Sequence, residues 1–315
     1  MNHATVTAEL LVRGLSVRAV DVPLRRPIRT ASGTIETAPL VLIDLYSDAD
    51  VVGHSYVFCY KRVALKPVAQ LTANLESLIE GQALAPLDID GMLQQRFRLL
   101  GPQGLTGIAM AGVDALAKAR GVPLANLLGG APRCIPAYDS LGMGGAKIAA
   151  REIAESAALG FTAAKIKIGY ADVKDDVAAI RAARRAGGDG FQVMVDYNQC
   201  LSVPEAIRRI RVLDDEGLAW IEEPTRADDF AGHALIAAEA KTPLQLGENW
   251  CGIHDMAKSL AAGASDYAMP EAMKIGGVTG WLRAAALAEA AAIPASSHLF
   301  PEISAHLLAV SPTAH

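Results

Sequence analysis

The sequence has few of the features that mark disulfide scaffolds, nucleic-acid-binding proteins or disordered chains. Neither sign of charge dominates: 29 basic residues stand against 34 acidic ones, and a net charge of −5 predicts neither a nucleic-acid footprint nor a polybasic membrane patch. Apolar residues make up 51% of the chain and charged residues 20%, which is typical of a folded globular protein. The cysteines share no short spacing, so no CxxC zinc or redox site is indicated, and scattered thiols favour a reducing cytoplasm. They are Cys59, Cys134, Cys200 and Cys251.

Long apolar segments are also absent from the sequence. The alanine-rich stretch from Trp281 to Ile293 is shorter than a membrane span and contains Arg283 and Glu289. The N-terminal residues MNHATVTAELLVRGL include charged side chains before any apolar segment forms, so no signal peptide is predicted. We therefore expect a cytoplasmic protein, and its 315 residues are enough for one large domain or two ordinary ones.

The spacing of apolar residues changes once in the first part of the chain. Residues 8–60 read as strands in LLVRGLSVRAVDV, PLVLIDLYS and VVGHSYVF. Between the first two strands, PLRRPIRTASGTIETAP is rich in Pro, Thr and Gly and is predicted to be a loop. Residues 64–128 instead repeat apolar residues every three or four positions, which predicts helices. We therefore expect an α+β domain over residues 1–130.

Residues 131–315 show short apolar runs that alternate with amphipathic helical stretches. Each run ends in a polar residue, and successive polar residues lie 23 to 29 positions apart, the length of a strand, a turn and a helix. Seven such units in a row favour a (β/α) barrel over an open sheet, and barrel enzymes keep their chemistry at the C-terminal strand ends. The polar residues are Ser140, Lys167, Asp196, Glu222, Glu248, Glu271 and His298.

The segment AAKIKIGY, residues 163–170, places two lysines in an otherwise apolar run. Side chains alternate along a strand, so Lys165 and Lys167 share one face while Ile166 and Ile168 share the other. The isoleucines suit packing against helices, so we expect the lysines to point into the barrel mouth. Neighbouring buried ammonium groups disfavour each other's charge, which shifts one of them toward the neutral form that a lysine base needs. The alternative is an exposed strand with solvated lysines.

Three acidic residues, Asp196, Glu222 and Glu248, end consecutive predicted strands. Converging carboxylates repel one another unless a cation holds them, and hard oxygen ligands suit Mg²⁺, with Mn²⁺ as a substitute. Separate salt bridges with lysines are the alternative. His298 lies opposite the lysines around the predicted ring, and Glu271 on the neighbouring strand could hold the tautomer of its imidazole.

Several motifs together resemble the enolase superfamily, and within it the mandelate racemase subgroup. They are KIKIGY, VMVDYNQ, WIEEPT, GENW, MKIGGVTGW and SSHLF, with TAPLVLIDL and VVGHSY nearer the N-terminus. The resemblance implies an α/β fold in which an N-terminal α+β cap covers a (β/α)7β TIM-like barrel. It also implies Mg²⁺ held by Asp196, Glu222 and Glu248, and a small-molecule carboxylate as the substrate of a homo-oligomer, by resemblance an octamer.

The same resemblance implies roles for individual side chains. Lys167 is the base on one face of the substrate and His298 the base on the other, while Lys165 neutralises the substrate carboxylate and lowers the pKa of Lys167. Ser140 and Asn198 contact substrate oxygens. The implied reaction removes the proton alpha to a carboxylate through an enediolate, most simply to racemise or epimerise a mandelate-like 2-hydroxy acid. Dehydration of an acid sugar on the same residues is the alternative.

Three departures from the family pattern qualify this expectation. Glu271 stands where the subgroup has Asp, and a displaced carboxylate weakens catalysis. The chain stops at SPTAH, before the eighth strand of the family, so we expect a barrel that is incomplete at its C-terminal end, with an exposed strand edge. The predicted lid, RRPIRTASGTI, carries Arg29 and Ser32, which favours a polar substrate unless Arg29 points to solvent. A catalytically impaired binding protein is the alternative of another class.

Overall fold

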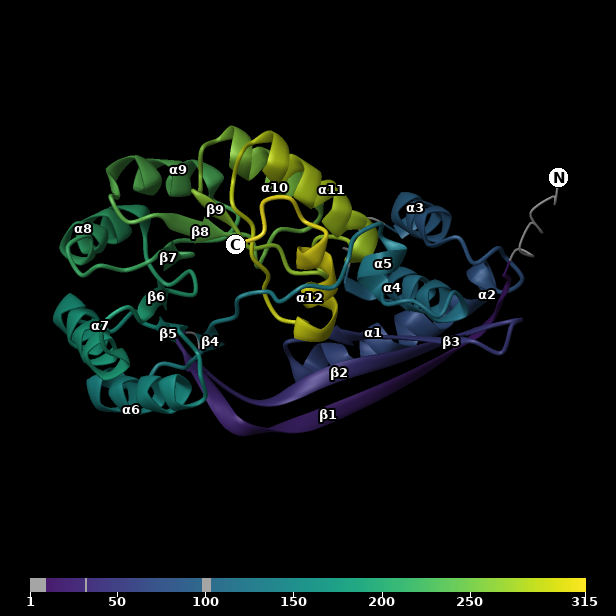
Figure 1. Ribbon diagram of the computed structural model, residues 1–315, viewed down its shortest axis with the longest axis horizontal. Helices are drawn as coiled ribbons and strands as arrows, with labels where there is room; N and C mark the ends of the chain where they lie inside the picture. The colour runs from purple at the N-terminus through teal and green to yellow at the C-terminus, as the bar shows by residue number, and fades with distance from the viewer. Residues whose placement is uncertain (1–9, 32, 98–102) are drawn as a thin grey trace.

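A three-stranded antiparallel sheet and a six-stranded parallel sheet form the frame of the described chain. The structure is a computed structural model, and it describes residues 10–31, 33–97 and 103–315. Figure 1 shows the long antiparallel strands passing beneath the helices of their own domain and reaching the parallel sheet at one end. Within these residues, none of the helices combines the length and apolar character that crossing a bilayer requires. The four cysteines form no disulfide within the described chain.

The antiparallel sheet is covered on one face by helices. Its strands pair in the order β1-β2-β3, and every second residue of the central strand from Pro39 to Ser47 is buried, including Val41, Ile43 and Leu45. The helix α4 approaches so closely at Gly53 that a Cβ there would lie 1.9 Å from the Ala111 carbonyl oxygen. The elements are β1 (Val12–Thr30), β2 (Gly33–Ser47), β3 (Val52–Phe58), α1 (Arg62–Asn74), α2 (Glu76–Ile79), α3 (Pro86–Phe97), α4 (Gln103–Ala119) and α5 (Leu124–Leu127).

The predicted loop between the first two strands is wrong, because β1 and β2 continue through it as a long hairpin. The register shifts between Pro23 and Ile28, which pair with Thr37 and Ile35. Proline lacks a backbone N–H, but β1 is an edge strand, where an irregular register accommodates it. The predicted lid is therefore a β-hairpin, and the backbone N–H of Met143 donates to the carbonyl of Arg29 at 2.8 Å.

The parallel sheet confirms the predicted barrel topology. Its strands follow one another in chain order, β4-β5-β6-β7-β8-β9, and isolated parallel bridges continue the order through Ala295 to Ala314. The strands are β4 (Asp139–Ser140), β5 (Ala163–Lys167), β6 (Gln192–Asp196), β7 (Ile221–Glu222), β8 (Leu244–Leu246) and β9 (Tyr267–Ala268). The helices are α6 (Gly145–Ala158), α7 (Val173–Gly187), α8 (Val203–Leu213), α9 (Phe230–Glu239), α10 (Ile253–Ala261), α11 (Gly277–Ala290) and α12 (Pro301–Ala309).

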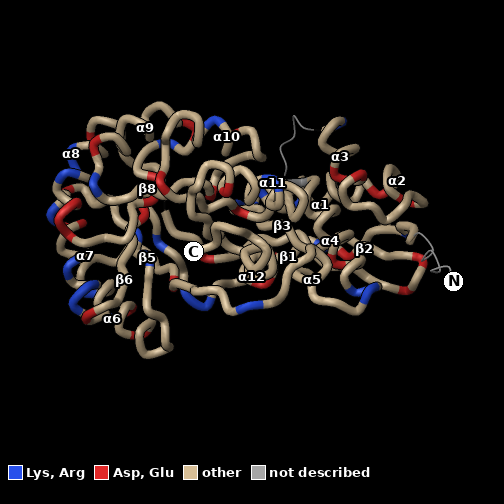
Figure 2. The backbone as a smooth tube through the Cα atoms, turned by 45° about the horizontal axis from the view of Figure 1, so that its top comes forward, with Lys and Arg blue, Asp and Glu red and all other residues tan. Residues whose placement is uncertain are grey.

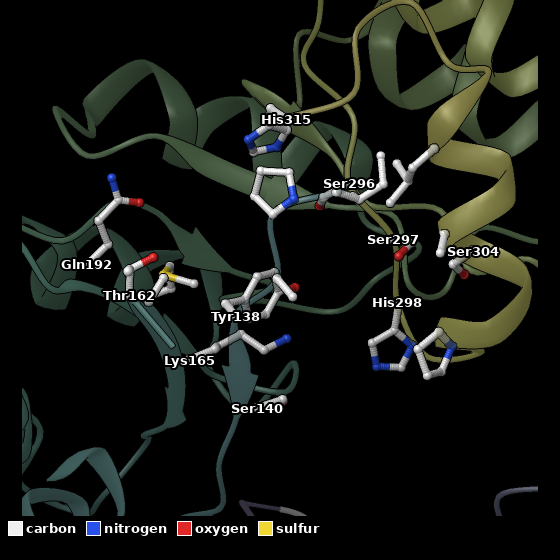
Figure 3. Close-up of a pocket in the computed structure, with 18 of the residues that line it drawn as sticks. Tyr138, Ser140, Thr162, Lys165, Gln192, Ser296, Ser297, His298, Ser304 and His315 are labelled. Atoms are coloured by element: carbon white, nitrogen blue, oxygen red, sulfur yellow. The ribbon is translucent and has the colours of Figure 1, made fainter. Parts of the chain in front are cut away.

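The barrel sheet is open at one seam. The carbonyl of Thr313 accepts from Ala295 N at 2.9 Å, and His315 N donates to the Ala295 carbonyl at 3.1 Å, so the last residues lie beside the segment that follows α11. On the other side of the seam, β4 pairs only with β5 among the described strands. A cavity of about 600 Å³ separates the two edges, and Figure 3 shows residues from both edges lining it. The expected open strand edge is therefore present in the described structure.

One apolar cluster joins the two sheets into a single structure. It contains Ile43 of β2, Ile108 of α4 and Trp281 of α11, all of them buried. A second cluster lies between the barrel strands and α6 to α8, and it includes Ile166 and Ile168. The isoleucines of the KIKIG segment therefore face the helices, as predicted, and the lysines face the barrel interior.

Replacement of Gly53 by alanine tests the contact between the antiparallel sheet and α4. Gly53→Ala is expected to destabilise the protein by about 1–3 kcal/mol, because the added methyl group must displace the backbone of α4. Gly91→Ala is the matched control, since nothing lies within 4 Å of its Cβ position in α3. That change is expected to stabilise the helix by about 0.5–1 kcal/mol. Urea unfolding measures both, and equal effects would contradict the close approach.

Candidate active site

The ends of β5, β6 and β7 bring two lysines against two carboxylates. Lys165 Nζ lies 2.5 Å from Glu222 Oε1, and Lys167 Nζ lies 2.6 Å from Asp196 Oδ2. Lys165 Nζ is also 3.8 Å from that Asp196 oxygen. Figure 2 shows basic residues at β5 and acidic residues near β8 in the interior of the barrel. The alternation of the KIKIG strand thus delivers both ammonium groups to the acidic strand ends.

The predicted acidic trio converges in the structure. One carboxylate oxygen from each of Asp196, Glu222 and Glu248 lies within 4.8 Å of the other two, and all three residues are buried. Glu222 Oε2 has no hydrogen-bond partner in the described structure. Burial raises the pKa of Glu222 to about 7 despite the opposing charge of Lys165, and repulsion from Asp196 and Glu248 contributes. A buried, unpaired oxygen among close carboxylates fits a hard divalent cation such as Mg²⁺.

Lys165 is the lysine expected to carry the charge that neutralises a substrate carboxylate, whereas the neutral form expected of Lys167 stays a prediction. Burial by itself lowers the pKa of Lys165, but Glu222 together with Tyr138, Asp196 and Glu248 outweighs burial and raises that pKa well above its usual range. Lys165 therefore stays protonated in this arrangement, because its ammonium group is paired and not merely beside another ammonium. The salt bridges posed as the alternative to a metal site are present, and they involve two of the three carboxylates that could hold the ion.

His298 contacts the acidic trio from the other side. Its Nε2 lies 3.0 Å from Glu248 Oε2, whereas its Nδ1 lies 3.7 Å from Glu271 Oε2, too far for a hydrogen bond. Burial alone lowers the pKa of His298, but the adjacent Glu248 carboxylate reverses the shift and raises that pKa to about 9. The expected bond between Glu271 and the imidazole is therefore not formed in this arrangement.

The remaining predicted residues lie at different distances from this cluster. Ser140 lines the cavity at the open seam, where it is paired in register with Lys165. Asn198 donates from Nδ2 to Asp196 Oδ2 at 2.9 Å, and its own side-chain oxygen is buried without a partner. Arg29 is exposed in a separate groove that Ser140 also borders, and Ser32 lies outside the described residues.

The carboxylates do not line the 600 Å³ cavity themselves, among the residues that the structure describes. Lys165 and His298 do line it, from β5 and from the segment after α11, and each contacts a carboxylate behind it. Figure 3 shows these two side chains reaching into the cavity from different walls. A molecule in the cavity would therefore meet an ammonium group and an imidazole first.

Sequence reasoning missed four polar residues that surround the site. Glu223 is buried and accepts from Asn249 Nδ2 at 2.7 Å, and burial, with repulsion from Glu248, raises the pKa of Glu223 well above its usual range. Lys274 Nζ donates to the Glu248 carbonyl at 2.9 Å. Tyr60 donates its hydroxyl to Glu271. The WIEEPT, GENW and MKIGGVTGW motifs contained the first three, but nothing in the sequence connected Tyr60 with a residue 211 positions away.

Comparison with protein families decides the relationship. Residues 12–129 match the mandelate racemase / muconate lactonizing enzyme N-terminal domain, and residues 149–315 match the enolase C-terminal domain-like family. The chain belongs to the enolase superfamily. The family and the fold expected from the sequence are thus confirmed, with a capping domain and a TIM-barrel-like domain.

Relatives of this enolase-superfamily chain carry out different reactions. It is similar to the structure of an enolase from Bradyrhizobium complexed with magnesium and mandelic acid, with 44% identity, a TM-score of 0.94, and coverage of 98% of this chain and 88% of that chain. It is 32% identical over 214 residues to L-talarate/galactarate dehydratase of Salmonella typhimurium, covering 67% of this chain and 54% of the relative. It is 35% identical over 227 residues to 3,6-anhydro-alpha-L-galactonate cycloisomerase of Streptomyces coelicolor, covering 69% and 62%. The chain therefore spans less than two thirds of the length of these two curated relatives.

Thermal unfolding with and without Mg²⁺ tests the acidic trio as a metal site. Saturating Mg²⁺ is expected to raise the melting temperature by about 3 °C or more, because an ion that binds only the folded state stabilises it. Glu222→Gln is expected to abolish the increase. The control is Glu289→Gln, an exposed carboxylate on α11, which should leave the increase unchanged. An undiminished increase in Glu222→Gln would show that the ion binds elsewhere.

Proposed function

We propose that this chain is an enzyme that uses Mg²⁺ to remove the proton alpha to a carboxylate and so racemises or epimerises a 2-hydroxy acid. One observation carries the proposal. Lys167 contacts the acidic trio through Asp196 at 2.6 Å, and His298 contacts it through Glu248 at 3.0 Å. Two proton carriers therefore flank one prospective metal site, from β5 and from the segment after α11, as a reaction that exchanges a proton between two faces requires.

The chemistry explains why these residue types suit the reaction. A proton alpha to a carboxylate is a very weak acid, and its removal places a second negative charge on the carboxylate oxygens. A bound Mg²⁺ supplies electrostatic stabilisation of that charge. Lys165 adds an ammonium group beside the trio, Lys167 takes the proton from one face, and His298 returns one to the other face. The configuration at the alpha carbon is thereby inverted.

The Bradyrhizobium relative supports a hydroxy-acid substrate. That structure contains magnesium and mandelic acid, a 2-hydroxy acid with an aromatic substituent, and it covers 98% of this chain at 44% identity. The buried acidic trio of this chain supplies the oxygen ligands that Mg²⁺ prefers. We also infer that Ser140 and Asn198 contact the substrate oxygens, since both lie beside the trio or its lysines.

A second candidate is an acid-sugar dehydratase that uses the same residues. Arg29, Ser140 and Arg151 border one groove, which offers charged and hydroxyl partners to a polyhydroxy substrate. The 32% identity to the L-talarate/galactarate dehydratase supports this alternative. Division of the chain at residues 130 and 131, cytoplasmic location and assembly into a homo-oligomer remain further predictions.

Incubation in D₂O separates the two candidate reactions. With Mg²⁺ and a panel of 2-hydroxy acids and acid sugars, a racemase is expected to incorporate deuterium at the alpha carbon and to form the other enantiomer. A dehydratase releases water and forms a 2-keto product, and the impaired binding protein exchanges nothing. NMR follows exchange, and chiral chromatography follows inversion. Turnover that persists in excess EDTA would contradict the metal assignment.

Single substitutions test whether two different bases serve the two faces. Lys167→Ala is expected to abolish exchange from one enantiomer, and His298→Asn to abolish it from the other. Each variant lacks one proton carrier, so each affected rate should fall by about 10²-fold or more. Initial rates of alpha-proton loss from each pure enantiomer measure this. Equal residual rates from both enantiomers in either variant would contradict the two-base scheme.

A further inference from the structure

A cap-domain tyrosine contacts the carboxylate assigned to the second base. Tyr60 follows β3, and its hydroxyl donates to Oε2 of Glu271, which follows β9 in the barrel. Glu271 is fully buried, and desolvation together with the Glu271 charge raises the pKa of Tyr60, so the phenol keeps its proton. The contact therefore joins a neutral donor of one domain to a buried carboxylate of the other.

Lys274 fixes the same carboxylate from a second direction. Its Nζ lies 3.2 Å from Glu271 Oε2 and 4.1 Å from the centroid of the Tyr60 ring. The ammonium also donates to the Glu248 carbonyl at 2.9 Å and to Asn249 Oδ1 at 3.0 Å. Lys274 is thus held by several partners at once, and the Oε2 atom of Glu271 has two donors that cannot easily move away.

The second oxygen of the Glu271 carboxylate can still accept a hydrogen bond. Glu271 Oε1 and His298 Nδ1 are both buried and have no hydrogen-bond partner in the described structure. The imidazole already lies 3.7 Å from Oε2. A small rotation of the ring would bring Nδ1–H to the carboxylate, and catalytic hydrogen bonds often shorten in this way when substrate binds. Because Tyr60 and Lys274 hold Oε2, the carboxylate stays in place for that contact.

We propose that Tyr60 is a positioning residue which, with Lys274, holds Glu271 for His298 and so makes the second base depend on the cap domain. The inference rests on the proposed two-base reaction. The contact with Tyr60 requires a glutamate, because an aspartate at position 271 would draw the carboxylate back by about 1.5 Å, the length of one carbon–carbon bond. Glu271 therefore reaches a partner in the cap that the shorter side chain would not reach.

The expected effect of Tyr60→Phe is confined to one half of the reaction. Loss of a hydrogen bond to a charged group lowers the rate of alpha-proton loss by about tenfold for the enantiomer that His298 deprotonates. The other enantiomer, deprotonated by Lys167, should keep its rate within about twofold, and KM should change for neither, since Tyr60 positions a base and does not hold the substrate. Racemisation itself slows equally in both directions, because the two enantiomers are isoenergetic, so exchange from each pure enantiomer is the informative measurement.

A double-mutant cycle shows whether Tyr60 acts through Glu271. Glu271→Asp, Tyr60→Phe and the double variant are compared with the unaltered protein, and Tyr60→Phe should have less than about a twofold further effect in the Glu271→Asp background. Tyr46→Phe is the matched control, because this tyrosine of β2 is exposed on the same sheet. Its exchange rates should equal those of the unaltered protein.

Urea unfolding of the same four proteins gives a readout that does not need activity. Tyr60 and Glu271 should be coupled in the free energy of unfolding if their contact is present. Slower exchange from one enantiomer only, with coupling in both measurements, supports the inference. Equal slowing from both enantiomers, faster exchange, or additive effects of the two substitutions would overturn it. If the unaltered protein exchanges no hydroxy acid while Tyr60 and Glu271 remain coupled in unfolding, the proposed function fails and the contact stands.

Discussion

The arrangement of the site depends on offsetting the repulsion among three carboxylates, whose nearest oxygens the fold buries within 4.8 Å of one another. Such a cluster is stable only when positive charge or donors compensate it. Lys165, Lys167 and His298 all contact members of the cluster, and Asn198 donates to the Asp196 oxygen that Lys167 also contacts. The same groups that neutralise the cluster are the ones that could bind a carboxylate substrate or carry its proton. Compensation of buried charge and preparation for catalysis are thus carried by one set of side chains.

The two domains contribute unequally to this arrangement. The barrel supplies all the charged groups that contact the acidic trio in the described structure, because its strands end at one rim. The contacts of the cap with that rim include two that lie near the site. The β1–β2 hairpin reaches β4, where Met143 N bonds the Arg29 carbonyl at 2.8 Å, and Tyr60 reaches Glu271. Because one apolar cluster spans both domains, these contacts are held by a continuous core.

Some features of the site follow from local sequence patterns and others do not. The alternation in KIKIG placed both lysines inside the barrel, since residues two apart on a strand share a face. The even spacing of polar residues placed Asp196 and Glu222 at neighbouring strand ends, because parallel strands in chain order end at one rim. The prediction of a loop at residues 23–39 is wrong, because proline and glycine occur at irregular positions of paired strands as well as in turns. The pairing of Lys165 with Glu222, which is 57 residues away, did not follow from the sequence, and this pairing helps to raise the pKa of Lys165.

The sequence by itself determined the order of strands, the face on which each polar residue lies and the family to which the chain belongs. Those properties follow from side-chain alternation, from the length of a strand-helix unit and from motifs read along one chain. Only the tertiary structure decided which partners pair: Lys165 with Glu222, His298 with Glu248, and Glu271 with Tyr60 and Lys274. The physical reason is distance. A difference of less than 1 Å separates the 3.0 Å contact of His298 with Glu248 from the 3.7 Å approach to Glu271, and sequence spacing does not resolve it.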